Sequence, residues 1–442
     1  MKGRGLWLLL AISLPAAAGR RAVILDVDGV RRDVFETAWR EGRLPRFARL
    51  LENAVWYENA SAVFPSETLP GQGALFTGTW PGRHGIPGNS WYDRESGTAI
   101  EYTSVSGIAC VYGHALLWGR DCGGGLANRH LLVPTLYQAA SAAGKTSLVA
   151  FNHYWKGATR ALTPSVLDAL ELVRGDSVDA EAFDRLMLRR LLAALEEPAD
   201  IVTVYFAGAD AVGHVDGNAA QSRYLSEVVD PALGVLLDRL DETVPGWQDE
   251  TLFVLAADHG RTTALPFPEG RQAQAALDAA LGRAGDPGGR VSFNGGMAHV
   301  YTSAPDATAH EITLSTLGDA IDSVLVREGE GYRVHGGDGR AAPELTLRLA
   351  SARSGDVLIL LKPGLYFGNQ GTGSQHGSIH AEDLAVPLAL AGGGLLAKTC
   401  AEPASTTQVA STIAAFLGFQ MMDAEPPLPC LFFQANPGQN TK

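Results

Sequence analysis

The sequence predicts an α/β fold built on a mostly parallel sheet with helices on both faces. Short apolar runs recur along the chain, and a run without polar alternation is typical of a strand that is covered on both faces. Helical patterns separate these runs, and strands that alternate with helices favour parallel pairing. The predicted strands are 22–27, 147–151, 201–206, 252–257, 357–361 and 386–390. The predicted helices are 44–53, 133–143, 180–195, 224–240 and 407–417.

The composition is that of a globular protein. The chain has 442 residues, of which 46% are hydrophobic and 19% are charged, so it can bury a large core. The formal net charge of −13 argues against duplex nucleic acid as the main partner, because duplex binding needs clustered Lys and Arg. An acidic protein can still bind phosphate where metal ions supply the positive charge.

Residues 1–18 read as a secretory signal peptide. The segment MKGRGLWLLLAISLPAAA places basic residues before an apolar stretch and small residues at its end. The apolar stretch is too short to span a bilayer, and no later run reaches the length of a membrane helix. We therefore expect residues 19–442 to form a soluble protein that is secreted or periplasmic.

The cysteines fit an oxidising compartment. Cys110, Cys122, Cys400 and Cys430 are even in number, and their spacing suggests that Cys110 pairs with Cys122 and Cys400 with Cys430. Four cysteines allow three pairings, and four free buried thiols are a further alternative.

Two stretches interrupt the alternation of strands and helices. Residues 90–129 are rich in Gly, Trp and Tyr, whereas residues 263–355 contain strand-like and helical pieces without a metal-ligand signature. We interpret both stretches as insertions that cap the site of a single catalytic domain, 19–442.

Seven scattered residues have the side chains needed to hold two metal ions around a nucleophilic hydroxyl. Several of them follow an apolar run, which is where α/β proteins place their chemistry. The seven residues are Asp28, Thr68, Asp210, His214, Asp258, His259 and His376.

The first strand ends in two acidic residues that allow two interpretations. Asp28 closes the strand before Gly29, and we expect its carboxylate to project from the carboxyl end of the sheet. Asp26 faces the same way but lies deeper, where a structural role is expected. The segment DVDGV also matches the first motif of haloacid dehalogenase phosphatases, with Asp26 as the nucleophile. That alternative leaves the later Asp and His signatures unexplained.

Two further pairs of candidate ligands follow later strands. Asp210 and His214 are four residues apart, so one helical turn would place both on the same face. Asp258 and His259 are adjacent, and Gly260 permits the sharp turn that would direct both to one site.

The remaining ligand and the nucleophile each have a competitor. His376 lies in a loop rich in Gly, Ser and Thr, and His380 is the alternative ligand. Thr68 stands where a helix is expected to begin, so that its hydroxyl and amide would face a phosphate at a positive helix end. A Thr hydroxyl is a poor nucleophile unless a metal ion activates it. Ser66 is the alternative hydroxyl.

The chain contains the segments FPSETLP…FTGTWPGRHGIPGNSWYD, DAVGH, AADHG and QHGS. Together they resemble the alkaline phosphatase superfamily, and most closely its nucleotide pyrophosphatase/phosphodiesterase branch. The resemblance runs from about residue 22 to residue 417 and implies an alkaline phosphatase-like fold with two zinc ions. Manganese and iron are alternatives by ligand type. The resemblance assigns one zinc to Asp210, His214 and His376, and the other to Asp28, Asp258 and His259, with Thr68 beside the second as the nucleophile.

The resemblance also implies residues that contact the substrate. Asn89 in IPGNSWYD matches a donor to a phosphoryl oxygen, with the Leu69 amide beside it. Tyr205 resembles an aromatic platform of nucleotide-cleaving relatives, although a core Tyr is equally consistent with its place in a strand. Lys156 in FNHYWKGATR is the best cationic contact for a dianionic monoester, unless it is a solvated loop residue.

Two positions depart from related patterns. Gly71 stands where relatives often have Asn, which puts one supporting contact in doubt. Thr68 differs from the Cys or Ser that sulfatases modify, so a sulfatase is disfavoured.

We therefore expect a secreted two-zinc phosphohydrolase that forms a phosphorylated or nucleotidylated Thr68, in the first place a phosphodiesterase or nucleotide pyrophosphatase acting on a small-molecule ester. A phosphomonoesterase or phosphonate hydrolase is the alternative on the same scaffold. A protein that binds metal or phosphate without turnover is the alternative of another class.

Overall fold

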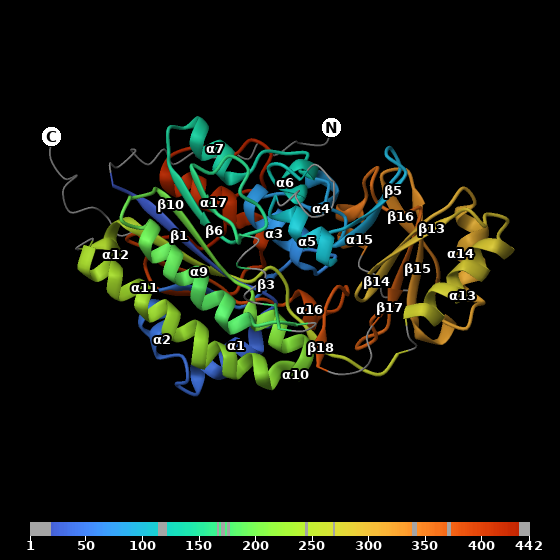
Figure 1. The fold of residues 1–442 in the computed structure, drawn as a ribbon, viewed down its shortest axis with the longest axis horizontal. Coiled ribbons are helices and arrows are strands. Elements are labelled where there is room, and N and C mark those ends of the chain that lie inside the picture. Colours follow the sequence, from blue (N-terminus) through green and yellow to red (C-terminus); the bar gives the residue numbers. More distant parts are fainter. Residues whose placement is uncertain are drawn as a thin grey trace, which may run out of the picture.

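The computed structural model describes residues 19–432, apart from 114–121, 166–167, 169–172, 175–176, 244–245, 268–269, 338–342 and 369–372. The predicted signal peptide therefore lies outside the described residues. Two large sheets follow one another along the long axis of the molecule (Figure 1). Among the described residues, no helix is both long enough and apolar enough to cross a membrane.

The larger sheet has eight strands and confirms the predicted α/β fold. In spatial order they are β20 (Lys398–Cys400), β2 (Val55–Tyr57), β19 (Leu388–Gly392), β11 (Thr251–Ala256), β1 (Arg21–Val27), β10 (Ile201–Phe206), β6 (Ser147–Ala150) and β7 (Arg160–Leu162). The central strand β1 runs parallel to both of its neighbours, β10 and β11. Only β19 is reversed, since it pairs antiparallel with both β11 and β2.

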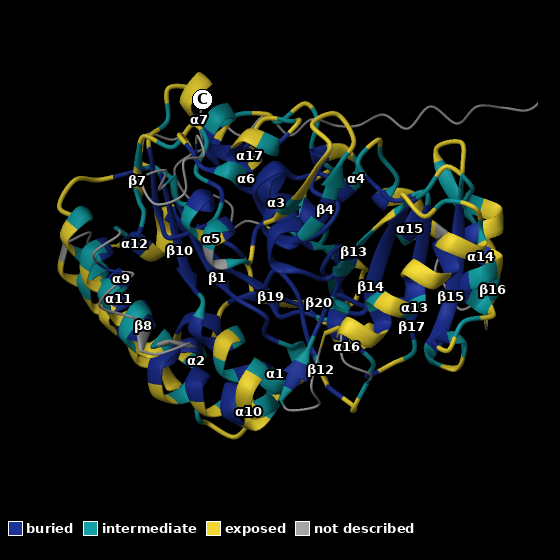
Figure 2. Ribbon diagram, turned by 45° about the vertical axis from the view of Figure 1, so that its right-hand side comes forward, coloured by how far each residue is buried: buried dark blue, intermediate teal, exposed yellow. Residues whose placement is uncertain are grey.

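Helices cover both faces of this sheet, as the continuous apolar strands predict. Every residue of β10 and β11 is buried, and Figure 2 shows β1 and β10 in a buried layer between more exposed helices. One helical layer contains α1 (Arg32–Arg40), α2 (Pro45–Leu51), α9 (Ala180–Ala194), α10 (Gly208–Tyr224), the π-helical turn η1 (Leu225–Val229) and α11 (Asp230–Thr243). The other contains α3 (Thr68–Thr77), α7 (Leu136–Ala142) and α17 (Val409–Leu417).

The smaller sheet is antiparallel throughout. Its spatial order is β13 (Arg290–Asn294), β14 (Met297–Tyr301), β17 (Val357–Leu361), β15 (Ile321–Glu328) and β16 (Gly331–Gly337). The strand predicted at 357–361 has the predicted bounds, but the expectation that it belongs to the parallel sheet was wrong. An apolar run identifies a buried strand and does not identify the strands that pair with it.

Both faces of the smaller sheet are packed. The helices α13 (Gly270–Arg283) and α14 (Pro305–Thr313) cover one face, and α15 (Pro343–Leu349) lies near the other. Val357, Ile359 and Leu361 belong to the cluster under α13 and α14, whereas Leu358 and Leu360 pack in a second cluster that contains Phe64. The second face therefore contacts the segment that leads to Thr68.

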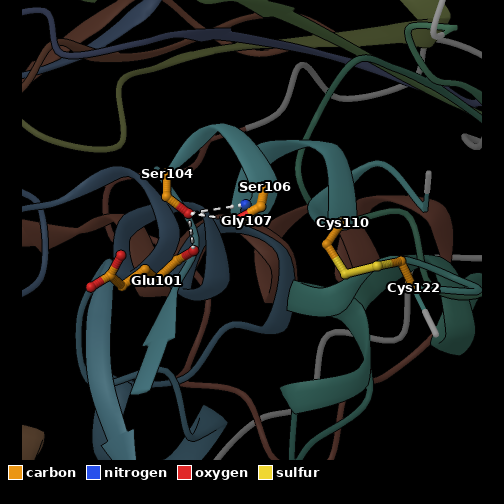
Figure 3. Close-up of a disulfide and its surroundings, with 6 residues drawn as sticks. All are labelled: Glu101, Ser104, Ser106, Gly107, Cys110 and Cys122. Atoms are coloured by element: carbon orange, nitrogen blue, oxygen red, sulfur yellow. Dashed lines mark hydrogen bonds between the residues drawn. A yellow bond between two sulfur atoms is a disulfide. The ribbon is translucent and has the colours of Figure 1, made fainter. Parts of the chain in front are cut away.

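In its described residues, the first predicted insertion forms a hairpin and two short helices. These elements are β4 (Ser90–Asp93), β5 (Thr98–Glu101), α5 (Val105–Val111) and α6 (Leu126–His130). Figure 3 shows that Ser104 Oγ accepts a hydrogen bond from Gly107 N at the start of α5, and that Cys110 at its end is bonded to Cys122.

Both predicted disulfides are confirmed. The Cα atoms are 4.9 Å apart in Cys110–Cys122 and 6.0 Å apart in Cys400–Cys430. The remaining short elements are β3 (Ala60–Ser61), α4 (Pro81–His84), β8 (Val173–Arg174), β9 (Ser177–Val178), α12 (Trp247–Glu250), β12 (Thr262–Thr263), η2 (Gly318–Ala320), β18 (Ser374–Gln375), α16 (Ala381–Leu384), β21 (Ala404–Ser405) and η3 (Thr406–Gln408).

Candidate metal centre

The candidate ligands meet at the carboxyl ends of the three central strands. Asp28 follows β1, Asp210 lies in the first turn of α10 after β10, and Asp258 and His259 follow β11. Because these strands are adjacent and parallel, their carboxyl ends lie at one edge of the sheet. His376 comes from the loop after β18 and approaches the same place.

Asp210, His214 and His376 form the first group of possible metal ligands, with one ligand atom from each residue within 4.8 Å of the others. His214 Nε2 lies 3.0 Å from Asp210 Oδ2 and 3.2 Å from His376 Nε2. The helical spacing of Asp210 and His214 therefore places both side chains on one face of α10, as the sequence predicts. His376 Nδ1 is 3.1 Å from the Ser66 carbonyl oxygen, which directs Nε2 to the group.

A second group shares one residue with the first. Asp28, Asp210 and His259 also offer ligand atoms within 4.8 Å of one another, and His259 Nε2 lies 3.3 Å from Asp28 Oδ1. Asp258, which the resemblance assigns to this group, stands beside it, with Oδ2 4.0 Å from His259 Nε2. Asp258 Oδ1 accepts hydrogen bonds from Gly29 N at 3.1 Å and His259 N at 3.0 Å.

Two carboxylate oxygens at this centre are buried without a hydrogen-bond partner among the described residues. They are Asp28 Oδ1 and Asp258 Oδ2. Buried anionic oxygens that lack a donor are costly unless a cation compensates them. The set of imidazole nitrogens and carboxylate oxygens suits zinc, and the two orphaned oxygens fit ligation of a cation.

The charges at the centre also fit a cation site. Burial, together with the charge of neighbouring Asp28, raises the pKa of Asp258 well above its usual value. Although burial lowers it, Asp258 and Asp28 raise the pKa of His259 to about 10. Burial and the nearby His259 lower the pKa of His376 well below its usual value, so its ring is neutral and can act as a ligand. The raised pKa values of Asp258 and His259 both reflect neighbouring carboxylates, whose charge a bound cation would compensate.

Thr68 is the first residue of α3 and lies within this centre. Its Oγ1 is 3.3 Å from His259 Nε2, and the residue is 8% exposed. The alternative hydroxyl, Ser66 Oγ, donates to the Ser378 carbonyl and accepts from Gly377 N. These two bonds give Ser66 a structural role and leave Thr68 as the hydroxyl beside the candidate ligands.

Two other competitors from the sequence are accounted for by structural contacts. His380 Nε2 is 2.8 Å from the Leu361 carbonyl oxygen in the smaller sheet, and His380 is absent from both ligand groups of the described residues. Asp26 is fully buried, and its Oδ2 accepts a hydrogen bond from Asn152, whereas its Oδ1 has no partner among the described residues. The structure thus gives Asp26 a buried, hydrogen-bonded position below Asp28, which disfavours its role as a haloacid dehalogenase nucleophile.

Asn89 is held by both neighbours of Thr68. Its Oδ1 accepts from Leu69 N at 3.0 Å, and its backbone N donates to Glu67 Oε2 at 2.7 Å. The Leu69 amide, expected to face the substrate, is therefore directed to Asn89. This bond orients the Asn89 side-chain amide relative to the Thr68 hydroxyl.

Tyr205 and Lys156, the other two predicted substrate contacts, lie in different surroundings. The buried Tyr205 hydroxyl donates to Asp28 Oδ2. Burial and Asp28 raise the pKa of this hydroxyl well above its usual value, so it remains a donor. Lys156 is half-buried, and the loop around it is held by bonds from its backbone N to Asn128 and from Thr135 to its carbonyl.

Arg261 is a residue of the centre that sequence reasoning missed. It is fully buried and donates to Asp210 Oδ1 at 2.7 Å and to the Asp210 carbonyl at 2.8 Å. A Cβ on Gly213 would overlap Arg261 Nη1, so that glycine leaves the space for the guanidinium. Burial would raise the pKa of Asp210, but Arg261 and His214 hold it well below its usual value. The position of Arg261 directly after Asp258, His259 and Gly260 was the available signal.

Comparison with known proteins shows relatives in sequence and in fold. The chain is 23% identical over 239 residues to ectonucleotide pyrophosphatase/phosphodiesterase family member 3 of Rattus norvegicus, covering 54% of this chain and 24% of that protein. It is 24% identical over 239 residues to a venom phosphodiesterase of Macrovipera lebetinus, with 54% and 25% covered. The chain thus spans about a quarter of the length of these curated relatives.

Solved structures show the same fold. Wild-type alkaline phosphatase PafA superposes with a TM-score of 0.69 at 18% identity, covering 93% of this chain and 99% of that one. Murine ectonucleotide pyrophosphatase/phosphodiesterase 5 gives a TM-score of 0.66 at 16% identity, with 92% and 97% covered. The family model for type I phosphodiesterases and nucleotide pyrophosphatases matches residues 22–382, and the chain therefore belongs to the type I phosphodiesterase/nucleotide pyrophosphatase family.

Proposed function

We propose that this protein is a secreted or periplasmic two-zinc hydrolase that cleaves phosphate diesters through Thr68. The observation that carries the proposal is the position of the Thr68 hydroxyl, 3.3 Å from His259 Nε2 and beside two ligand groups that share Asp210. A protein that only bound metal or phosphate would need no hydroxyl at this point.

The ligand assignment rests on the donor atoms and on their burial. Asp210, His214 and His376 would hold one zinc. Asp28, Asp258 and His259 would hold the other, because both carboxylates have a buried oxygen without a donor. Manganese or iron could use the same donor types. Bound zinc would lower the pKa of a coordinated hydroxyl and neutralise charge on the phosphoryl and leaving oxygens.

The chain's own residues would carry the two displacement steps. Thr68 Oγ1 gives up its proton and attacks phosphorus, the bond from phosphorus to the leaving oxygen breaks, and the leaving oxygen takes up a proton. Water then attacks phosphorus, breaks its bond to Thr68 Oγ1 and regenerates the hydroxyl. Because Asn89 Oδ1 accepts from Leu69 N, the Asn89 Nδ2 group is the end that can donate to a non-bridging phosphoryl oxygen.

The contacts of Arg160 favour diesters over monoesters as substrates. A monoester dianion needs more cationic contacts than a diester does. Arg160, close to Lys156 in the sequence, donates to the Ala194 carbonyl and to Glu197, at the end of α9. Lys156 remains the candidate cation of this loop, and Tyr205 supports Asp28. Because the chain shares its fold with alkaline phosphatase PafA, phosphomonoesters remain an alternative substrate class. A phosphonate hydrolase is a further alternative on the same scaffold.

A pair of variants at Thr68 tests the proposal. Thr68→Ala should abolish turnover while the protein keeps its bound zinc, and Thr68→Ser should retain part of the rate because a hydroxyl remains. Thr98→Ala is the matched control, since Thr98 is an exposed strand residue. Full activity of Thr68→Ala at full zinc occupancy would refute a role for Thr68 as the nucleophile.

The substrate class is tested with three chromogenic esters. Rates are compared for para-nitrophenyl phosphate, bis-para-nitrophenyl phosphate and a para-nitrophenyl ester of a nucleotide, each with and without a chelator. We expect the two diesters to be turned over faster than the monoester and the chelator to stop all three reactions. A faster monoester rate would favour the phosphatase alternative, and no turnover of any ester would favour the binding protein.

A further inference from the structure

We propose that the turn at residues 294–297, between β13 and β14, is a positioning element that fixes the positions of Asn89 and His376 relative to one another. This proposal rests on the roles assigned above to these two residues. The turn belongs to the second predicted insertion, for which the sequence shows no ligand signature. Its residues are Asn294, Gly295, Gly296 and Met297.

Asn294 holds the chain directly after Asn89. Its side chain is 1% exposed, its Oδ1 accepts from Ser90 N at 2.8 Å and its Nδ2 donates to Ser90 O at 2.9 Å. A Cβ on Gly88 would overlap Asn294 Oδ1, so the glycine at 88 permits this close approach. The buried Asn294 side chain therefore contacts the loop on both sides of Asn89: it is hydrogen-bonded to Ser90 and packed against Gly88.

A second residue of the same sheet holds the start of this loop. His299 in β14 lies with Nε2 3.0 Å from the Pro87 carbonyl oxygen, and its Nδ1 accepts from Gly355 N at 3.1 Å. The loop that carries Asn89 is thus bonded to the smaller sheet at Pro87 and at Ser90. The position of Asn89 relative to Thr68 depends on this support as well as on Leu69 and Glu67.

The same turn contacts the loop that carries His376. Gly296 N donates to the His376 carbonyl at 3.2 Å. Gly295 has φ +55°, and a Cβ added there would overlap the His376 carbonyl oxygen. A Cβ on Gly377 would lie 2.6 Å from the Asn294 carbonyl oxygen. Backbone is packed on backbone at this point, so a shift of the turn must shift His376.

The two contacts couple a phosphoryl-oxygen donor to a metal ligand. The loop that carries Asn89 and the loop that carries His376 are far apart in the sequence, and the turn 294–297 contacts both of them. Supporting groups of this kind commonly change metal affinity or activity by 10- to 100-fold when they are removed. Displacement of the turn should therefore weaken metal binding through His376 and slow turnover through Asn89.

A matched pair of glycine variants tests the contact with His376. Gly295→Ala and Gly329→Ala both place a side chain at a positive φ, of +55° and +59°, in a turn of the smaller sheet. A Cβ at Gly329 meets nothing within 4 Å, whereas one at Gly295 overlaps His376. We expect Gly295→Ala to lower zinc affinity by about tenfold in competition with a chromogenic chelator. Gly329→Ala should bind zinc as the unaltered protein does.

A double-mutant cycle tests the contact with Asn89. Asn294→Ala should lower kcat by about tenfold with little change in KM, and it should have no further effect in an Asn89→Ala background. Circular dichroism and thermal unfolding establish that each variant is folded. If Gly295→Ala does not fold, the cycle alone decides.

Two results would overturn the proposal. One is equal zinc affinity of the Gly295→Ala and Gly329→Ala proteins. The other is a loss of kcat on Asn294→Ala that is the same with and without Asn89. If the unaltered protein hydrolyses none of the three esters, the proposed function fails, and the zinc competition still decides whether the turn positions His376.

Discussion

Lowering the pH should destabilise the fold through His299, and the size of the effect follows from the contacts of this one side chain. The ring is fully buried, with Nε2 facing the Pro87 carbonyl and Nδ1 accepting from Gly355 N. A neutral ring satisfies both partners, whereas a proton on Nδ1 would face the Gly355 N–H. Burial, with a smaller contribution from the charge of Arg94, lowers the pKa of His299 from 6.5 to about 4.

The direction of the effect follows from the two pKa values. Because the pKa is lower in the folded state, the unfolded chain takes up the proton first as the pH falls below 6.5. Stability is thus lost between pH 6.5 and about pH 4. The difference of roughly 2.5 units corresponds to roughly 3 kcal/mol of unfolding free energy once both states have titrated.

The assay is urea denaturation of the unaltered protein and of His299→Gln at about pH 7.5 and about pH 4.5. Glutamine can donate to Pro87 and accept from Gly355 but does not titrate. The stability difference between the two proteins should shift by roughly 2 to 3 kcal/mol in favour of the variant at the lower pH. The comparison cancels contributions from other histidines. A difference that stays the same at both pH values would refute the reasoning.

Three further outcomes are expected. Gly71→Ala should lower the unfolding free energy by about 1 to 3 kcal/mol in urea titrations, because the added Cβ would overlap the Asp258 carbonyl oxygen. An unchanged urea midpoint would show that α3 can move away from Asp258. Tyr205→Phe removes the donor to Asp28 and should weaken zinc binding about tenfold in chelator competition, and unaltered affinity would contradict this role. Zinc at a hundredfold excess over its Kd should add about 2.7 kcal/mol of stability, so a chelator should lower the Tm; a Tm that is independent of chelator would argue against a bound metal.

Much of the parallel sheet is predictable because its signals are local. The predicted strands and most of the predicted helices are found within a few residues of their expected bounds, since an apolar run or a helical repeat is a property of contiguous residues. The helix predicted at 224–240 is instead divided between η1 and α11. The pairing of Asp210 with His214 has the same origin, because their separation along one helix fixes the face that they share.

Sequence patterns predict less well which strands pair with one another and which buried side chains are in contact. The strand β17 has the expected bounds but pairs with β14 and β15, which lie elsewhere in the chain. Arg261 and its space beside Gly213 are visible only when α10 and the end of β11 are placed together. Neither feature leaves a periodic pattern in the sequence.

The sequence by itself determined the fold class and singled out the residues able to supply ligands and a nucleophile. It suggested the disulfide pairs, which the structure confirmed. These inferences depend on composition, spacing and short motifs, which are complete within single segments. Only the tertiary structure decided that Asp210 lies within reach of both groups of possible ligands, that the Leu69 amide is directed to Asn89, and that the turn 294–297 contacts the loops of Asn89 and His376 together. The physical reason is that hydrogen bonds and steric overlap act over a few ångströms in space, between segments whose separation along the chain carries no information about that distance.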